Sequence, residues 1–265
     1  MNVVVCIKQV PNTTQVKIDP KTNTLIREGV ESVINPFDTY AIEEGVRIKE
    51  KTGGKVIVIT MGPPQAEVAL REAISVGCDE AILISDRKFA GSDTWATSYT
   101  LSQAIKKVNK INPVNIILCG KQASDGDTAQ VGPGIATFLN IPQITYVRRI
   151  DKIENDHLVV ERLVEDGYEI INTAIPCLMT VVKEINEPRL PSLKGKIKAK
   201  SAQIIHWTAA ELECDPKNIG LEGSPTKVLK IFNPPIKSNG EILKGETGEI
   251  VDKLAGILKQ EISGA

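Results

Sequence analysis

The stretch VNIILCGKQASDGDTAQVGPGIA, residues 114–136, decides the fold. Its apolar start predicts a buried strand, its small and polar middle predicts a loop, and a helix is expected to begin near Gly132-Pro133. Most turns need a single glycine, because one residue with a positive φ is enough to reverse the chain. This stretch has four, which we interpret as a sign of close approach to the backbone: Gly120, Gly126, Gly132 and Gly134.

Short apolar runs recur along the first 150 residues, and segments of helical periodicity separate them. Runs that are apolar throughout are typical of strands buried on both faces of a parallel sheet. The alternation predicts βαβ units, and therefore an α/β fold with a doubly wound, mostly parallel sheet. The expected strands are 3–7, 56–60, 81–85, 115–119 and 143–147, and the expected helices are 64–76, 94–108 and one capped at Asn35-Pro36 with Asp38 in its first turn.

Three regions depart from this alternation. Residues 16–27 predict a hairpin closed by a Pro-Lys-Thr-Asn turn. Residues 149–182 predict an added antiparallel hairpin region, with turns at Asn155-Asp156 and Asp166-Gly167. Residues 186–203 have no periodicity that would bury a face, and their lysines alternate as on one side of an extended strand: Lys194, Lys196, Lys198 and Lys200.

The C-terminal region has little apolar sequence from which to build a core. Its turn-rich stretch leads to a predicted helix from about Thr247 to Ile262, one side of which is apolar. We therefore expect an extended C-terminal arm that lies on the body of this chain or on a partner. The apolar residues of that helix are Ile250, Val251, Leu254, Ile257 and Leu258.

Composition excludes several classes of function. The 32 basic and 33 acidic residues give a net charge of −1, which argues against nucleic acid as a partner. The first apolar run is too short for a signal peptide or a membrane span, so we expect no membrane span and a cytoplasmic protein. Two histidines and five widely spaced cysteines without a CxxC pair predict reduced thiols and no metal site made by this chain alone.

The loop at 120–134 is the strongest candidate site. It follows the carboxyl end of a strand, where open α/β sheets bind ligands, and precedes a helix whose free N–H groups suit a phosphate. No G-x-G-x-x-G, Walker loop or G-x-S-x-G motif is present. Because no third acidic residue lies nearby, we expect Asp125 and Asp127 to cap the loop or contact ribose rather than to hold magnesium. The residues alone predict a nucleotide or phosphate site of unusual type, and a simple connecting turn stays as the alternative.

Four separated motifs resemble the small (beta) subunit of the electron-transfer flavoproteins. They are NPFD (35–38), KQASDGDTAQVGP (121–133), VERLVEDGYEIINTAIPCLMT (160–180) and NEPR (186–189). The similarity runs in the family's order from the first strand to about residue 205. Four motifs in order make the resemblance more specific than a glycine-rich loop alone.

The resemblance implies a Rossmann-like α/β fold and a heterodimer with a larger alpha subunit that holds an FAD. The beta subunit buries AMP in ordinary members and a second FAD in the electron-bifurcating members. That second FAD accepts hydride from NADH, and the electrons divide between ferredoxin or flavodoxin and, through the alpha-subunit FAD, a flavin dehydrogenase. Small residues in DGDTAQVGP leave room for a pyrophosphate, and this loop and KQVPNT resemble the bifurcating, mostly anaerobic branch. We therefore expect FAD, with AMP as the alternative.

The resemblance also implies which residues bind. Leu193, flanked by Pro191 and Ser192, aligns with the leucine of a recognition loop that docks a partner dehydrogenase. No residue is implied to be catalytic. The residues implied to bind the nucleotide are Cys6, Asn35, Pro36, Phe37, Asp38, Met61, Gly120, Lys121, Gln122, Ala123, Ser124, Asp125, Gly126, Asp127, Thr128, Ala129, Gln130 and Val131.

These expectations divide the chain into a nucleotide-binding α/β domain (1–185), a partner-recognition loop (186–205) and a C-terminal arm (206–265) whose helix packs on the partner subunit. The expected function is that of an electron-transfer subunit in a flavin-based, NADH-dependent oxidoreductase complex. Its dehydrogenase could be of the acyl-CoA or the lactate type. Two alternatives stay open: a non-bifurcating beta subunit with structural AMP, and a stand-alone adenine-nucleotide sensor.

Overall fold

The computed structural model describes residues 1–12, 17–18, 25–26, 32–229, 240 and 242–263. The chain divides into two compact units, Met1–Leu229 and Lys230–Ala265. The boundary falls at residue 230, later than residue 206, where the arm was expected to begin. The reason is that Trp207, Leu212 and Ile219 are buried in the core of the first unit.

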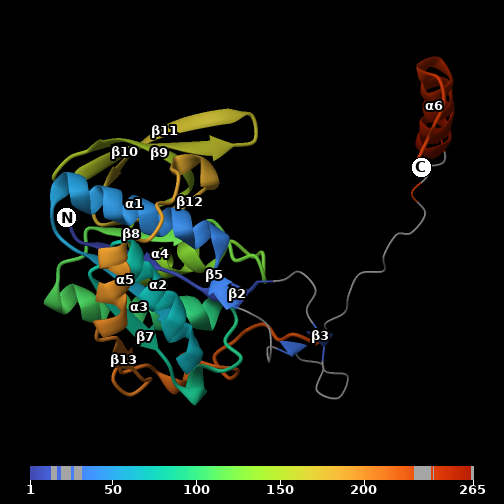
Figure 1. Cartoon of the computed structure of the whole chain (residues 1–265). Helices are drawn as coiled ribbons and strands as arrows, with labels where there is room; N and C mark the ends of the chain where they lie inside the picture. Colours follow the sequence, from blue (N-terminus) through green and yellow to red (C-terminus); the bar gives the residue numbers. More distant parts are fainter. Residues whose placement is uncertain (13–16, 19–24, 27–31, 230–239, 241, 264–265) are drawn as a thin grey trace. The chain divides into compact units, whose positions relative to one another are not determined.

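The first unit is built on a nine-stranded sheet (Figure 1). In sequence order its strands are β1 (Val3–Cys6), β6 (Val56–Met61), β7 (Glu80–Ile84), β8 (Ile116–Gly120), β9 (Gln143–Ile153), β10 (His157–Val164), β11 (Gly167–Ala174), β12 (Cys177–Val181) and β13 (Ile205–Trp207). In space the order is β11-β10-β9-β12-β8-β1-β6-β7-β13. All neighbours from β9 to β13 are parallel, whereas β10 is antiparallel to both β9 and β11.

Helices cover both faces of the parallel part of the sheet. Val3 and Val5 of β1 face a core formed with α1, α2 and α5, and Val4 and Cys6 face a core formed with α3 and α4. The doubly wound α/β architecture is therefore confirmed. The helices are α1 (Pro36–Thr52), α2 (Glu67–Val76), α3 (Thr94–Ile111), α4 (Val131–Leu139) and α5 (Leu193–Ser201), with 3₁₀ turns η1 (Pro64–Ala66), η2 (Arg87–Phe89), η3 (Lys183–Ile185) and η4 (Pro216–Asn218).

Two short ribbons lie outside the main sheet. Strand β2 (Gln9–Pro11) pairs with β5 (Ser32–Ile34), and β3 (Lys17–Ile18) pairs with β4 (Leu25–Ile26), both antiparallel. The second ribbon confirms the hairpin expected over 16–27, while its turn lies outside the described residues. Helix α6 (Thr247–Ser263) of the second unit confirms the predicted C-terminal helix.

Two sequence-based expectations are wrong. Strand β12 was expected among antiparallel strands, but it runs parallel to β8 and β9, and all five of its residues are buried, as in an inner strand of a parallel sheet. Residues 193–201 form a helix rather than an extended segment. The Ser192 hydroxyl caps that helix by accepting a hydrogen bond from the Gly195 N–H at 3.0 Å, and Ala199 packs in the core beside α2.

Candidate functional site

The chain reverses its direction of travel across the sheet between β1 and β8. From β1 it proceeds to β6 and β7 on one side, and α3 then returns it to β8 on the other side of β1. Because the connections diverge at this point, the carboxyl ends of β1 and β8 border the crevice where sheets of this kind bind ligands. Cys6 ends β1 and Gly120 ends β8, so the structure places the loop 120–131 at this crevice.

Asn35 holds the first part of that loop. Its side-chain Nδ2 donates to the Gln122 carbonyl at 2.9 Å, and its Oδ1 accepts from the Ser124 N–H at 3.0 Å. Asn35 is 1% exposed and occupies the N-cap position of α1, with Pro36 as the first helical residue, as expected from Asn35-Pro36, but its side chain gives the helix no capping hydrogen bond. Asn35 therefore positions the loop and has little surface left for a ligand.

Asp38 ties together the three segments that meet at the crevice. Its carboxylate accepts from the Lys8 N–H at 2.7 Å, from Asn35 Nδ2 at 3.0 Å and from the Gly120 N–H at 3.2 Å. Burial raises the pKa of Asp38 to about 7, although these hydrogen bonds favour the charged form and oppose that effect. Like Asn35, Asp38 is a positioning residue within the protein.

The four glycines of the loop have different roles. A Cβ at Gly120 would collide with Phe37 and Asp38, one at Gly132 would lie 2.6 Å from Thr180 Cγ2, and one at Gly134 would collide with Ser98. The close approach to the backbone expected from the glycines therefore occurs at these three, and the atoms that approach belong to the protein itself. A Cβ at Gly126 would meet nothing within 4 Å, so only this glycine faces open space.

The N-terminus of α4 provides the feature that suits a ligand. Within the described residues, the backbone N–H groups from Thr128 to Gly132 have no hydrogen-bond acceptor, and Gln130 gives the helix no side-chain cap. Asp127 and Ala129 have positive φ values of 50° and 54°. Alternation of left-handed and right-handed residues points successive N–H groups to one side, which is the geometry that binds phosphate. The loop therefore fits a phosphate-bearing nucleotide.

The charged residues of the loop are held by the protein. Lys8 Nζ lies 2.6 Å from Asp125 Oδ1, and Gln122 Nε2 donates to Asp127 Oδ1. Lys121 Nζ lies over the ring of Phe37 at 5.2 Å and over that of Tyr146 at 5.5 Å. Phosphate binding here would thus depend mainly on backbone amides.

Sequence reasoning missed three neighbours of the loop: Lys8, Tyr146 and Thr94. Thr94, in the first turn of α3, has its Oγ1 3.0 Å from Gln130 Oε1. The sequence did indicate a position near the site for Lys8, because this residue follows a buried strand at the ligand-binding edge of the sheet. Nothing in the local sequence separates Thr94 or Tyr146 from other surface residues.

The remaining predicted contacts lie beneath or beside the loop. Cys6 and Cys119 are registered neighbours on β1 and β8, and each is 7% exposed. A hydrogen bond between the two thiols, together with burial, raises the pKa of Cys119, so this thiol is a poor nucleophile. Met61 ends β6, one strand further along the same edge, and is half-buried.

Leu193 lies on another part of the molecule. It begins α5 and is 77% exposed, and the preceding Leu190 is 89% exposed. The NEPR motif fixes this segment to α1, because Arg189 contacts Glu43 and Glu50 at 2.8 Å and 2.6 Å. The leucine therefore projects from a firmly anchored segment.

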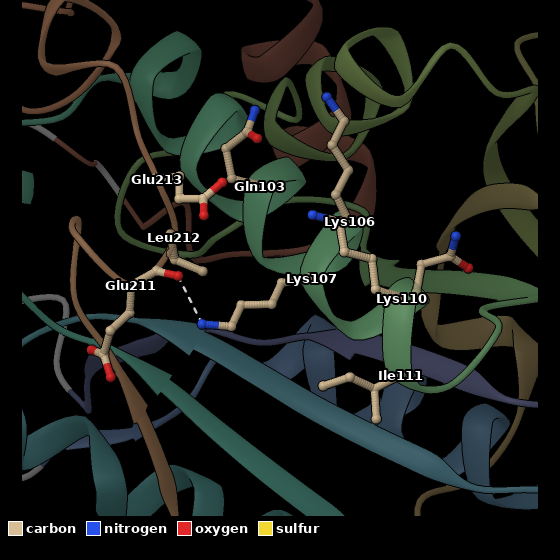
Figure 2. A pocket seen from close by; sticks show the side chains of 9 residues that line it. Gln103, Lys106, Lys107, Lys110, Ile111, Glu211, Leu212 and Glu213 are labelled. Carbon is tan, nitrogen blue, oxygen red and sulfur yellow. Dashed lines mark hydrogen bonds between the residues drawn. The ribbon is translucent and has the colours of Figure 1, made fainter.

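A hollow of about 620 Å³ occurs on the opposite edge of the sheet (Figure 2). It lies between the C-terminal half of α3 and the turn at 211–213, near the amino ends of the strands. Lys107 Nζ closes one side by donating to the Glu211 carbonyl at 2.7 Å. Its lining residues come from α3 and residues 211–213, and none belongs to the loop 120–131.

Comparison with known proteins shows the family to which this chain belongs. The family described as "Electron transfer flavoprotein domain" matches residues 22–212. The chain belongs to the electron transfer flavoprotein family. It is 56% identical over 257 residues, 96% of each chain, to the electron transfer flavoprotein subunit beta of Thermoanaerobacterium thermosaccharolyticum.

Two further relatives of this electron transfer flavoprotein chain have different names. The caffeyl-CoA reductase-Etf complex subunit CarD of Acetobacterium woodii is 51% identical over 263 residues, 98% of this chain and 99% of CarD. Protein FixA of Azotobacter vinelandii is 46% identical over 253 residues, 94% of this chain and 90% of FixA. The resemblance to beta subunits of the family is thus confirmed along nearly the whole chain. Among the described residues, no helix has the length and apolarity that crossing a membrane requires.

Proposed function

We propose that this chain is the beta subunit of an electron-bifurcating electron transfer flavoprotein and that it binds FAD at the loop 120–131. The observation that carries the proposal is the run of N–H groups at the N-terminus of α4, at the switch point of the sheet, for which the described residues provide no acceptor. These amides would hold a diphosphate without a charged side chain. Asn35 and Asp38 keep the loop in the conformation that presents them.

The loop favours FAD over AMP. No described residue lies within 4 Å of a Cβ built at Gly126, and Thr128 and Ala129 are small, so the part of the chain that the structure describes leaves a path outward from the amides. AMP ends at a single phosphate, whereas FAD needs room for a second phosphate and the flavin beyond it. The open side of the loop gives that room.

When bound, FAD would supply the redox chemistry of the complex, as a group that can take the two electrons of a hydride from NADH and give them up singly, to ferredoxin or flavodoxin and, through the alpha-subunit FAD, to a dehydrogenase. The residues of this chain hold and orient the nucleotide. The buried Cys6 and Cys119 thiols and the buried Asp38 carboxyl exclude water from the floor of the site. The family implies a heterodimer with an alpha subunit, which we propose to be cytoplasmic, and the name of CarD supports a reductase as a further partner.

The nucleotide content of the purified heterodimer tests the proposal. Acid release followed by chromatography should give two FAD per heterodimer, and NADH added without oxygen should bleach flavin absorbance. One FAD with one AMP would assign the chain to the non-bifurcating members. ATP bound by the chain without a partner would instead support a nucleotide sensor.

Variants of Ala129 locate the nucleotide. Ala129→Leu should expel it, because the larger side chain stands among the free amides at a position with φ of 54°. Ala129→Gly is the matched control and should retain the nucleotide, since it keeps the space and suits the positive φ. Lys121→Ala should weaken binding only modestly. Full FAD content in Ala129→Leu would show that the nucleotide lies elsewhere.

A further inference from the structure

Two of the five free cysteines lie side by side under the loop 120–131. Cys6 of β1 and Cys119 of β8 are partners in the register of these parallel strands, and both face the core formed with α3 and α4. A hydrogen bond joins their thiols. Cys78 and Cys177 belong to the other core. Cys6 and Cys119 therefore form a pair of thiols at the ligand-binding edge of the sheet, and we call them the dithiol.

The spacing of the two strands suits a disulfide within the dithiol. Neighbouring strands lie about 4.8 Å apart, and a disulfide joins residues whose Cα atoms are about 4.4–6.8 Å apart and whose Cβ atoms do not point away from each other. Registered partners on the same face of a sheet meet both conditions. Each of the two residues is 7% exposed, so an oxidant as small as hydrogen peroxide can reach the dithiol.

We propose that Cys6 and Cys119 are a site of oxidation by peroxides, and that the resulting disulfide releases the nucleotide from the loop 120–131. The release of the nucleotide rests on the proposed function, whereas the formation of the disulfide does not. The residues and the oxidant that the reaction needs are thus two neighbouring thiols of this chain and one molecule of peroxide.

The hydrogen bond to Cys6 and burial raise the pKa of Cys119, so this thiol keeps its proton and the Cys6 sulfur attacks first. Attack on one oxygen of hydrogen peroxide breaks the O–O bond and gives a sulfenic acid and one water. The Cys119 sulfur then displaces the hydroxyl group of the sulfenic acid, which leaves as a second water as the S–S bond forms. The two sulfurs lose two electrons, which reduce the peroxide, and both thiol protons end in water.

The strand ends that contain the dithiol also hold the loop. Cys119 precedes Gly120, whose N–H donates to Asp38 at 3.2 Å, and the Lys8 N–H, two residues after Cys6, donates to the same carboxylate at 2.7 Å. The Cβ atoms of a disulfide lie only about 3.5–4.5 Å apart, so its formation draws the two strand ends together. Gly120 packs so closely against the start of α1 that a Cβ would collide there, so a small shift already disturbs these contacts and the loop that begins at Gly120.

Hydrogen peroxide added to the purified heterodimer tests the proposal. Mass spectrometry of peptides alkylated in denaturant should find Cys6 and Cys119 joined, with two hydrogen atoms fewer than the separate peptides. Nucleotide released in the same samples is measured by ultrafiltration and chromatography. The fraction of nucleotide lost should match the fraction of linked chain. Dithiothreitol should return both cysteines to thiols and restore nucleotide binding.

Two variants separate the dithiol from other oxidation, each compared with its own untreated sample. Cys119→Ala removes the second sulfur, so peroxide should give no linked peptide and no loss of nucleotide. Cys214→Ala, at a half-buried cysteine outside the dithiol, is the matched control and should lose nucleotide as the parent does.

Other outcomes overturn the proposal. Absence of the linked peptide at peroxide concentrations that oxidise Cys214 would show that the dithiol does not form a disulfide. Linked chain that keeps its full nucleotide content, or equal loss of nucleotide from Cys119→Ala, would exclude the release. The identity of the nucleotide is read separately, so AMP in place of the second FAD would contradict the proposed function and leave the dithiol as the site of oxidation.

Discussion

Two carboxylates of helix α1 bind two different segments of the chain, and the electrostatic surroundings of the two carboxylates are opposite. At its N-terminus, Asp38 receives only N–H groups of neutral amides from the nucleotide loop and its neighbours. One turn and a half further on, Glu43 accepts a hydrogen bond of 2.8 Å from the guanidinium of Arg189. Arg189 belongs to residues 186–205, for which we propose partner recognition and which we call the recognition segment. Both carboxylates are nearly inaccessible, at 5% and 3% exposure.

The pKa values of the two carboxyls move in opposite directions. Burial dominates at Asp38 and raises its pKa to about 7. Burial acts in the same direction at Glu43, but hydrogen bonds from Arg189 and Arg47 outweigh it and lower the pKa of Glu43. A cation thus compensates for burial where neutral N–H donors do not. The nucleotide loop and the recognition segment should therefore respond oppositely to pH.

The largest expected effect concerns Asp38. Between pH 4 and 7 the folded chain keeps a proton on Asp38 that the unfolded chain has lost, so this group makes the free energy of unfolding fall as pH rises. Asp38→Asn removes that dependence. Relative to the parent, the variant should gain on the order of 3 kcal/mol between pH 4.5 and 7.5, measured by denaturant unfolding of the full chain.

Asp166→Asn is the control for this prediction, because Asp166 is exposed in the turn between β10 and β11. It should leave the pH dependence of unfolding as in the parent chain. If the difference between Asp38→Asn and the parent stayed constant from pH 4.5 to 7.5, Asp38 would be ionised over that whole range and the prediction would be wrong.

The second effect concerns the ion pair. Arg189→Gln leaves Glu43 with Arg47 as its remaining cation and removes both contacts to Glu50. The free energy of unfolding should fall by about 1–3 kcal/mol at neutral pH. The loss should shrink as pH falls, because a carboxyl with a lowered pKa contributes its stability above its ordinary pKa and loses it on protonation.

Two readings check this second prediction. Nucleotide content should be unchanged in Arg189→Gln, since the recognition segment does not hold the loop. Arg87→Gln, at an exposed position, is the matched control and should unfold like the parent. If Arg189→Gln released the nucleotide, the two segments held by α1 would not be independent.

The same comparison shows what the sequence could predict. Five strands of the parallel part, β1, β6, β7, β8 and β9, were predicted because runs such as VIVI at 56–59 are apolar, and burial on both faces follows directly. Strands β12 and β13 of the same part were not predicted as parallel strands. Residues 35–38 were placed correctly near the loop through a family motif. Asn35 contacts residues 122–124, which lie nearly 90 residues further along the chain. No local sequence pattern encodes such a contact.

The glycines of the loop and the lysines of residues 194–200 show a related limit of sequence reasoning, because the atoms that approach the glycines and the conformation of the lysine-rich segment depend on distant residues. The collision that makes glycine necessary at residue 132 involves Thr180 on a strand far along the chain. Alternate lysines from 194 to 200 suggested an extended segment, yet lysine is also a good helix former, and Ser192 caps a helix that Ala199 attaches to α2. Local chemistry was correct in each case, but tertiary packing chose between its possible outcomes.

The smallest expected effect separates anchoring from docking in the recognition segment. We propose that Leu193 inserts into a pocket of the partner dehydrogenase, while Arg189 only fixes the segment from which it projects. Leu193 is 77% exposed, so Leu193→Ala should leave the free energy of unfolding and the FAD content unchanged. Burial of a leucine side chain contributes about 1.5–3 kcal/mol, so the dissociation constant for the dehydrogenase should rise about tenfold or more.

Ile111→Ala, at a site 69% exposed at the end of α3, is the control and should bind like the parent in the same titration. If Leu193→Ala and Ile111→Ala bound the dehydrogenase with equal affinity, Leu193 would not contribute to docking. The ion pairs of Arg189 would then stabilise the fold of this segment without serving dehydrogenase binding.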